Sequence, residues 1–243
     1  KKLIKVNGLK LSTLKELMGL LVVIVFTPED LNLIKGGPEF RRSFLNRKLI
    51  QINPLFYESS LSYQKVLSHR NKLLKMPNPT KNEMDIWDEQ LINHGSKLII
   101  ERKKILKKLN RMAKEIHRQL SGEKEELELI YQPSVSLSDE LDEREIGKAF
   151  QKQLKEHYKQ DLRRGFTSVG PHRDDFICLI NKINARLYGS QGQQRTGVLT
   201  LKLAMLKVLK EETGEYPVLL LDDVFSELDQ NRKEFLLKTI NNS

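Results

Sequence analysis

The chain has 243 residues and a formal net charge of +10, because 42 lysines and arginines outnumber 32 acidic residues. This length allows one large domain or two smaller ones, and the charge suits an anionic partner without specifying a fold. The longest apolar run, residues 20–26, is too short to cross a bilayer, and the single Cys178 excludes an internal disulfide, so we predict a reduced, cytoplasmic protein without a membrane partner.

The amino-terminal residues predict a small β unit. Asn7-Gly8 separates two alternating segments within residues 3–11 and indicates a hairpin, because Asn-Gly tolerates the positive φ angles of a two-residue turn. We expect a short helix at residues 12–18 and a buried strand at residues 20–26. The run Gly-Gly-Pro at residues 36–38 then interrupts the chain.

From residue 39 to about residue 165 the composition is strongly helical. Apolar positions recur at helical spacing across residues 81–120, which predicts one long helix of ~60 Å unless Gly95 bends it. Polar residues interrupt the apolar stripe, so a helical hairpin packed on its neighbours is favoured over a free coiled coil. A strand is expected at 127–131, and a second helix from an N-cap at Ser138 to about residue 164.

The carboxyl-terminal part returns to sheet-like alternation. We expect strands at 175–180 and 185–188, a helix at 196–212, and a last helix at 229–240. Between the last two helices, the apolar run 218–221 predicts a strand that is covered on both faces, as in a parallel sheet.

Two features of this part carry chemistry. The strand at 218–221 ends in Asp222-Asp223, at the edge of the sheet where α/β proteins bind ligands. The stretch Gly-Ser-Gln-Gly-Gln-Gln at 189–194 opens a helix and directs backbone N–H groups at an anion, although an ordinary strand-to-helix turn has the same composition. At Gly192 a β-carbon would hold a phosphate away. In this order and spacing, the two features together indicate an ATPase.

These motifs resemble those of ABC-type ATPases. Residues 190–194 resemble the signature motif, residues 218–223 the Walker B strand, and residues 226–229 the D-loop. The sequence around these motifs is similar, over nearly the whole chain, to the RecF family of bacterial DNA replication and repair proteins, which belongs to the ABC/SMC-type ATPases. The stretches that carry this resemblance are 27–38, 40–47, 169–175, 190–196 and 214–229.

The resemblance implies an α/β fold, in which an ABC-type ATPase head, partial in this chain, is interrupted by an inserted α-helical lid domain. The expected head residues are 1–38 and 166–243, and the expected lid is 39–165. The phosphate loop G-x-x-x-x-G-K-[ST] that such a head needs is absent from the sequence, since Gly147-Lys148 is followed by Ala149. We therefore expect the chain to be the central and carboxyl-side portion of a longer protein, and to be inactive as an ATPase by itself.

The resemblance also implies roles for individual residues in a dimer of two heads that enclose ATP and Mg²⁺. Asp222 would hold Mg²⁺ through a water, and Asp223 would act as the catalytic carboxylate on the attacking water, with slow turnover. Ser226 and Asp229 would lie at the dimer seam. The signature residues would bind the nucleotide of the opposite subunit: Ser190, Gln191, Gly192, Gln193 and Gln194.

Basic residues at two places are candidates for DNA binding. Charge runs on helices are often only solvated faces, but neutralisation of phosphates by such residues would give salt-sensitive binding without sequence preference. The candidates are Arg41, Arg42, Arg47, Lys48, Lys104, Lys107, Lys108 and Arg111. For His172-Arg173-Asp174 we expect a structural ion pair at the entry to a strand, and the histidine spacing predicts no zinc site.

The resemblance implies a protein that dimerises with ATP on gapped or junction DNA and helps to load the RecA recombinase together with RecO- and RecR-type partners. One alternative is an SMC-like chromosome organiser, but its coiled-coil arms need a far longer insert than residues 39–165. Another is a non-enzymatic DNA-binding adaptor with a vestigial ATP site. Such a site would be expected to lose its carboxylates or its glycine, and both are retained.

Overall fold

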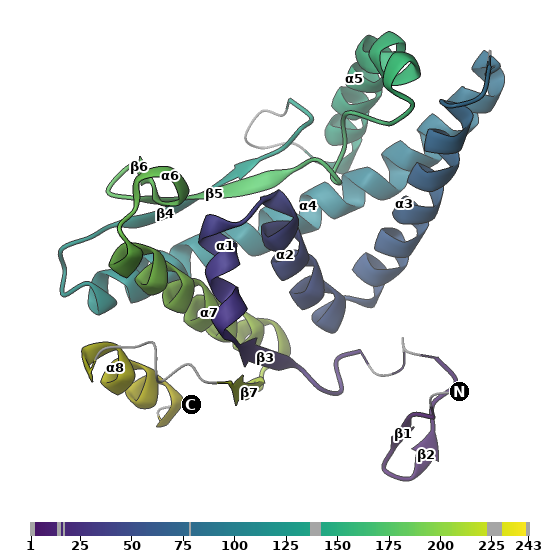
Figure 1. Ribbon diagram of the computed structural model, residues 1–243. Coiled ribbons are helices and arrows are strands. Elements are labelled where there is room, and N and C mark those ends of the chain that lie inside the picture. Colours follow the sequence, from purple (N-terminus) through teal and green to yellow (C-terminus); the bar gives the residue numbers. More distant parts are fainter. Residues whose placement is uncertain are drawn as a thin grey trace. The chain divides into compact units, whose positions relative to one another are not determined.

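The computed structural model describes residues 3–13, 16, 18–77, 79–136, 142–222 and 230–241 (Figure 1). Its strands are β1 (Lys5–Val6), β2 (Leu9–Lys10), β3 (Val23–Phe26), β4 (Leu127–Gln132), β5 (Asp175–Ile180), β6 (Ile183–Asn184) and β7 (Val218–Leu221). Its helices are η2 (Pro28–Leu31), α1 (Asn32–Lys35), α2 (Pro38–Ile52), α3 (Pro54–Leu73), α4 (Lys81–Leu120), α5 (Glu143–Arg164), α6 (Ala185–Tyr188), α7 (Gln191–Thr213) and α8 (Gln230–Asn241).

The chain forms two compact units. Unit 1 contains Lys1–Pro54, Ile105–Ile130 and Ile177–Ser243, and unit 2 contains Leu55–Lys104 and Tyr131–Phe176. This division differs from the expected head and lid, because α2 and residues 105–130 group with unit 1, whereas residues 166–176 group with unit 2. Across the described ranges, no helix combines the length and the apolar character needed to cross a membrane.

Several predicted elements are confirmed. β1 and β2 pair antiparallel around Asn7 and Gly8, whose φ angles are 49° and 81°. The helix α4 is continuous from Lys81 to Leu120. It continues through Gly95. A β-carbon at this position would lie 2.6 Å from the Phe150 ring of α5, so the close approach of the two helices requires glycine. Cys178 is buried, and burial raises the pKa of its thiol to about 12.

Three predictions differ from the structure, and a local cap accounts for each difference. α5 begins after Asp142, whose side chain accepts from the Glu145 N–H while the Glu145 side chain accepts from the Asp142 N–H; the expected N-cap Ser138 lies outside the described residues. Residues 185–188 are helical and not a strand, because Asn184 caps them through its side chain. α7 starts at Gln191, several residues before the expected helix, so the signature residues form its first turn.

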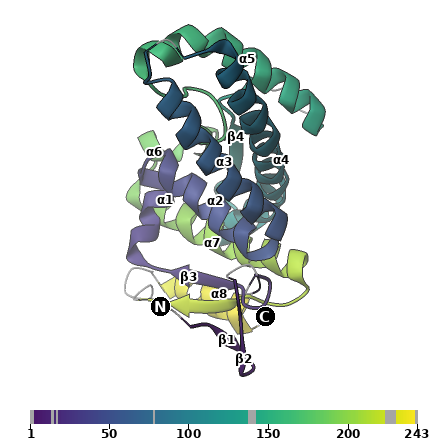
Figure 2. The ribbon, with the colours of Figure 1, turned by 90° about the vertical axis from the view of Figure 1, so that its right-hand side faces the viewer.

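The core of unit 1 is built around α7. Most of its residues from Gln194 to Leu209 are buried, and Leu201, Leu203, Ala204 and Met205 are fully buried. Helices α1, α2 and α6 and strand β3 all contact it. Figure 2 shows α1, α2 and α7 on one side of the paired strands β3 and β7.

β3 and β7 form a parallel pair with Val23 opposite Val218 and Phe26 opposite Leu221. Because side chains alternate between the two faces of a strand, Ile24 and Phe26 are buried, whereas Val218 and Leu220 remain 46% and 49% exposed. The prediction of a strand covered on both faces is therefore wrong within the described part of the chain, where the helices pack on one face only.

The free edge of β3 is closed by side chains instead of another strand. Gln51 accepts from the Val23 N–H at 2.9 Å, and Lys48 Nζ donates to the Val23 carbonyl at 2.6 Å. Lys202 of α7 donates to the Val25 carbonyl at 2.6 Å and forms an ion pair with Asp30 at 2.6 Å. A cavity of about 580 Å³ lies along this edge and is lined by these side chains and by Arg47. Lysines at this edge protect it against pairing with another chain.

Lys48 gives the stability of unit 1 a pH dependence. Burial, and then the charge of Lys202, lower the pKa of Lys48 to about 8, below the ~10.4 of an unfolded lysine. Between these two pH values the unfolded state binds more protons than the folded state, so the free energy of unfolding rises from about pH 8 to about pH 10.4. This gain in stability is lost again as the pH falls back to about 8. Lys48→Met should remove this gain. We expect the difference in unfolding temperature between the full-length protein and the variant to change across this range, whereas Lys35→Met, at an exposed lysine, should give a constant difference.

In unit 2 a buried arginine holds three segments together. Arg70 of α3 is fully buried, and its guanidinium bonds to Asp88 at 2.6 Å, Asp161 at 2.9 Å and Thr167 at 2.9 Å. Nearby, the expected ion pair at the entry to β5 is formed by Asp174 with Arg102, at 3.8 Å. Asp174 also accepts from Tyr131 and from the Ser134 N–H. Apart from Arg70 Nη2, which has no hydrogen-bond partner among the described residues, these charged groups are paired inside unit 2 and have a structural role.

Candidate nucleotide site

The signature residues lie at the amino-terminal end of α7, and the local sequence explains why the helix begins there. Ser190 is the N-cap: its Oγ accepts from the Gln193 N–H at 3.2 Å, and Gln193 Oε1 accepts from the Ser190 N–H at 2.9 Å. This reciprocal pair is a capping box. It leaves the first N–H groups of the helix, those of Gln191 and Gly192, without acceptors within the helix, at its positive end.

Ser190 has a hydroxyl that is available to a ligand. The side chain is exposed, and its oxygen is used as an acceptor by Gln193. Among the described residues its hydroxyl hydrogen donates to no protein group, so it can donate outward. Together with the free N–H groups of the first turn, it makes this end of α7 suited to a phosphate.

Gly192 is not required by the fold of this chain. A β-carbon at this position would find no atom nearer than 3.9 Å, and the residue does not adopt a positive φ. Glycine within a helix is less stable than alanine by roughly 1 kcal/mol. The absence of a side chain therefore suits the close approach of a group from outside the described residues, as expected for a phosphate.

Side chains from three elements hold the signature loop, by which we mean residues 190–194. Gln194 is buried and donates to the Ala185 carbonyl of α6 at 2.9 Å, so it braces the loop and is not exposed for a nucleotide contact. Arg232 of α8 donates to the Gly192 carbonyl at 3.4 Å. Glu125, in the turn after α4, accepts from Gln193 Nε2 at 2.8 Å. Sequence reasoning missed Arg232 and Glu125, because no local pattern links them to a loop so distant along the chain.

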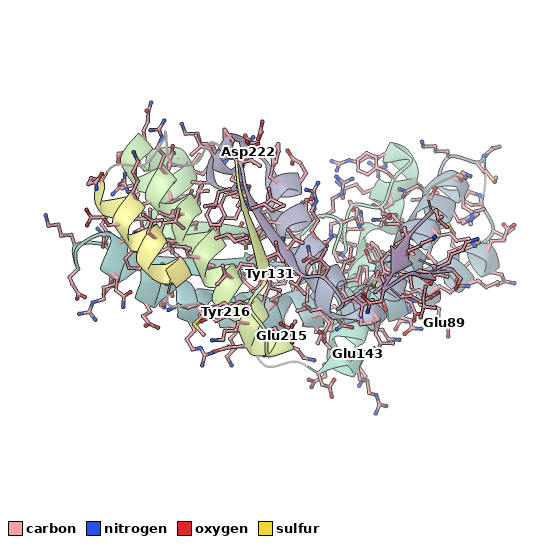
Figure 3. All side chains as sticks on the ribbon, turned by 90° about the horizontal axis from the view of Figure 1, so that it is seen from below. Glu89, Tyr131, Glu143, Glu215, Tyr216 and Asp222 are labelled. Carbon is pink, nitrogen blue, oxygen red and sulfur yellow. The ribbon has the colours of Figure 1, made fainter. Side chains whose placement is uncertain are left out.

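The carboxylate of Asp222 stands at the carboxyl end of β7. Figure 3 shows it at the opposite end of this strand from Tyr216. Its N–H donates to the Phe26 carbonyl at 3.0 Å, which ties the end of β7 to the end of β3, and its side chain is exposed. An exposed carboxylate oxygen at this edge fits Mg²⁺, which prefers oxygen ligands and keeps several waters. Asp223, Ser226 and Asp229 lie outside the described residues.

The candidates for DNA binding on α2 have different environments. Arg41 is 3% exposed and donates to the carbonyls of Leu33 and Gly36, at 3.3 and 2.9 Å. Lys48 is also buried, at the edge of β3. Both side chains are committed to backbone carbonyls, which removes them from the set proposed for DNA contact. Arg47 is exposed and Arg42 is half-buried.

The candidates on α4 are mostly paired with acids. Lys104 bonds to Glu101 at 2.8 Å, Lys108 to Glu212, and Arg111 to both oxygens of Glu211 at 2.9 Å. Lys107 is exposed. Exposed ion pairs contribute little stability, so a DNA phosphate can compete for these cations. Their role in DNA binding stays a prediction.

Comparisons with known proteins show which proteins the chain resembles. No protein-family model matches the chain. It is 46% identical to the DNA replication and repair proteins RecF of Clostridium tetani (strain Massachusetts / E88) and of Alkaliphilus oremlandii (strain OhILAs), over 99% of this chain in each case. The match covers 65% and 66% of those proteins, so the chain spans about two thirds of the length of these relatives.

Solved structures give the same result. The structure of the recombination mediator protein RecF-ATPrS in the RecFOR pathway matches 98% of this chain and 64% of that chain, with a TM-score of 0.91 and 42% identity. The corresponding RecF-ATP structure matches with a TM-score of 0.90 at the same identity. At this similarity, the fold of the described residues is that of the solved relatives.

Proposed function

Because the chain belongs to the RecF family, we propose that it is part of a DNA-binding ABC-type ATPase of recombinational repair. Its α/β fold, with an ABC-type head and a helical insert, is that of the solved RecF structures. The designations RecF-ATP and RecF-ATPrS of these relatives support ATP as the nucleotide.

The observation that carries the proposal is the exposed amino-terminal end of α7. Here the Ser190 hydroxyl, the N–H groups of Gln191 and Gly192 and the missing side chain of Gly192 form an anion site that none of the described residues fills. In our proposal this site receives the γ-phosphate of ATP held by a second subunit. Two such contacts join a dimer only while ATP is bound, so ATP acts as a clamp.

The carboxylates at the end of β7 serve the other half of the site. Asp222 holds Mg²⁺, which when bound neutralises the phosphate charge. Asp223 accepts a proton from the attacking water, and its reach is one methylene shorter than that of glutamate, which favours slow hydrolysis. Ser226 and Asp229 line the seam between the two subunits.

The dimer is proposed to close on gapped or junction DNA. Exposed cations of unit 1 supply phosphate contacts, among them Arg47 and Lys107. The RecFOR designation of the solved relatives supports RecO- and RecR-type proteins as partners, with loading of RecA as the outcome. An SMC-like organiser is less well supported, because the relatives that match the whole chain are RecF proteins. A vestigial ATP site is disfavoured, because Gly192 is retained where the fold does not require glycine and the carboxylate of Asp222 is exposed.

The test of the proposed function is the assembly state of the full-length protein. We expect sedimentation velocity to show monomers without nucleotide and dimers with ATP and Mg²⁺, and we expect gapped DNA to stabilise the dimer. Removal of Mg²⁺ with a chelator should return the protein to monomers. A monomer under all of these conditions would contradict the proposal.

A further inference from the structure

A relay of hydrogen bonds connects the buried end of α4 with the signature loop. His117 of α4 is fully buried, with its Nδ1 3.0 Å from Thr200 Oγ1 of α7. Its Nε2 lies 3.3 Å from Glu125 Oε2. The other carboxylate oxygen of Glu125 accepts from Gln193 Nε2 at 2.8 Å. The relay therefore runs from the core of unit 1 to the N-cap of α7.

Only one arrangement of hydrogens satisfies this relay. A carboxylate only accepts, so both His117 Nε2 and Gln193 Nε2 donate to Glu125. Burial lowers the pKa of His117 below its ordinary 6.5, against the opposing effect of Glu125, so the ring is neutral at pH 7. With its one hydrogen on Nε2, His117 accepts at Nδ1 from the Thr200 hydroxyl.

The carboxylate sets the orientation of the Gln193 amide. Because the amide nitrogen faces Glu125, the amide oxygen faces the Ser190 N–H and accepts from it at 2.9 Å. Without Glu125, the amide can rotate by a half turn. Two donors would then face each other at Ser190, and half of the capping box would be lost.

The turn that carries Glu125 is itself fixed. The Glu125 N–H donates to Ser121 Oγ at 3.1 Å, and the Glu126 N–H donates to Asn181 Oδ1 at 2.9 Å. The Glu125 side chain is 22% exposed. The carboxylate thus has little freedom to leave the loop, and the end of α4 and the signature loop are joined through it.

We infer that Glu125 is a positioning residue of the nucleotide site, which holds Gln193, and through it the Ser190 hydroxyl, in the geometry that receives a phosphate from the opposite subunit. The inference rests on the proposed function, because it assumes that the signature loop completes an ATP site. In this role Glu125 does not touch the nucleotide. It also gives α4 a direct connection to the part of the head that closes on ATP.

The test compares four variants of the full-length protein: Glu125→Ala, Glu125→Gln, Glu126→Ala and Ser190→Arg. Two quantities are measured, the ATP concentration for half-maximal dimerisation, by sedimentation, and the affinity of the monomer for a fluorescent ATP analogue. Glu126→Ala removes the same charge from the neighbouring residue, whose exposed side chain lies outside the relay, and serves as the matched control. Ser190→Arg reports on the proposed function itself.

We expect Glu125→Ala to raise the half-maximal ATP concentration roughly tenfold, the scale of one lost hydrogen bond to a charged group. Monomer affinity should be unchanged, because the nucleotide of each subunit is held elsewhere. Glu125→Gln should restore dimerisation, since its amide oxygen still accepts from Gln193 and its nitrogen can donate to His117 after a tautomer change. Glu126→Ala should match the unmodified protein.

The possible failures differ from one another. If Ser190→Arg blocks dimerisation but Glu125→Ala behaves like Glu126→Ala, the positioning role is wrong and the proposed function stands. If Glu125→Ala weakens monomer affinity equally, or if Glu125→Gln gives no rescue, the effect is general destabilisation and the inference is overturned. If Ser190→Arg dimerises normally, the proposed function fails, and the inference fails with it.

Discussion

Replacement of Ser190 by arginine in the full-length protein is expected to abolish ATP-dependent dimerisation while each monomer still binds ATP. Ser190 is exposed at the positive end of α7, and its hydroxyl has no acceptor among the described residues. In the proposed dimer this hydroxyl faces the γ-phosphate of the opposite subunit. An arginine side chain would occupy that space and block closure across the seam, whereas the nucleotide of its own subunit is bound elsewhere.

Sedimentation with and without ATP measures this effect, and titration with a fluorescent ATP analogue measures monomer binding. The matched control is Ser68→Arg, which places the same side chain at an exposed position of α3 in unit 2. Ser190→Ala should give a weaker defect, because it removes the donor and the cap without adding bulk, and loss of a serine N-cap costs about 1 kcal/mol. Normal dimerisation of Ser190→Arg would exclude Ser190 from the interface.

Replacement of Asp222 and replacement of Asp223 by asparagine are expected to cause two different defects. Asp222→Asn should weaken Mg²⁺-dependent ATP binding, because an amide is a poorer ligand for a hard cation than a carboxylate. Asp223→Asn should leave ATP binding intact, or tighten it by removing charge next to the triphosphate. Hydrolysis should slow by about 10²-fold or more, since the amide cannot act as a base. The ATP-bound dimer should then stay longer on DNA.

Three measurements on the full-length protein separate these outcomes: the ATP affinity at several Mg²⁺ concentrations, the single-turnover hydrolysis rate, and the residence time on gapped DNA. The volume of the side chain is nearly constant in both substitutions, so a folding defect should be small. Equal losses of nucleotide affinity in the two variants would contradict separate roles. Wild-type hydrolysis by Asp223→Asn would remove that residue from catalysis.

The sequence by itself determined the features that depend on local chemistry. Asn7-Gly8 predicted the hairpin because few residues tolerate its positive φ angles, and helical periodicity predicted α4 over its whole length. The signature and Walker B motifs indicated an ABC-type ATPase, because a phosphate site needs small residues and carboxylates at defined spacing along the chain. The resemblance to the RecF family rested on the longer stretches 27–38, 40–47, 169–175, 190–196 and 214–229. The relatives and their solved structures confirmed that family.

Only the tertiary structure decided which polar side chains are available to a ligand. Arg41 and Lys48 look like DNA contacts in a basic run, yet they are buried on backbone carbonyls. Gln194 is turned inward, whereas Ser190 is exposed in the same motif. Glu125 reaches Gln193 from far along the chain. The physical reason is that burial and long-range hydrogen bonds depend on which elements pack together, and a local pattern of residues carries no information about the partner that packing brings to it.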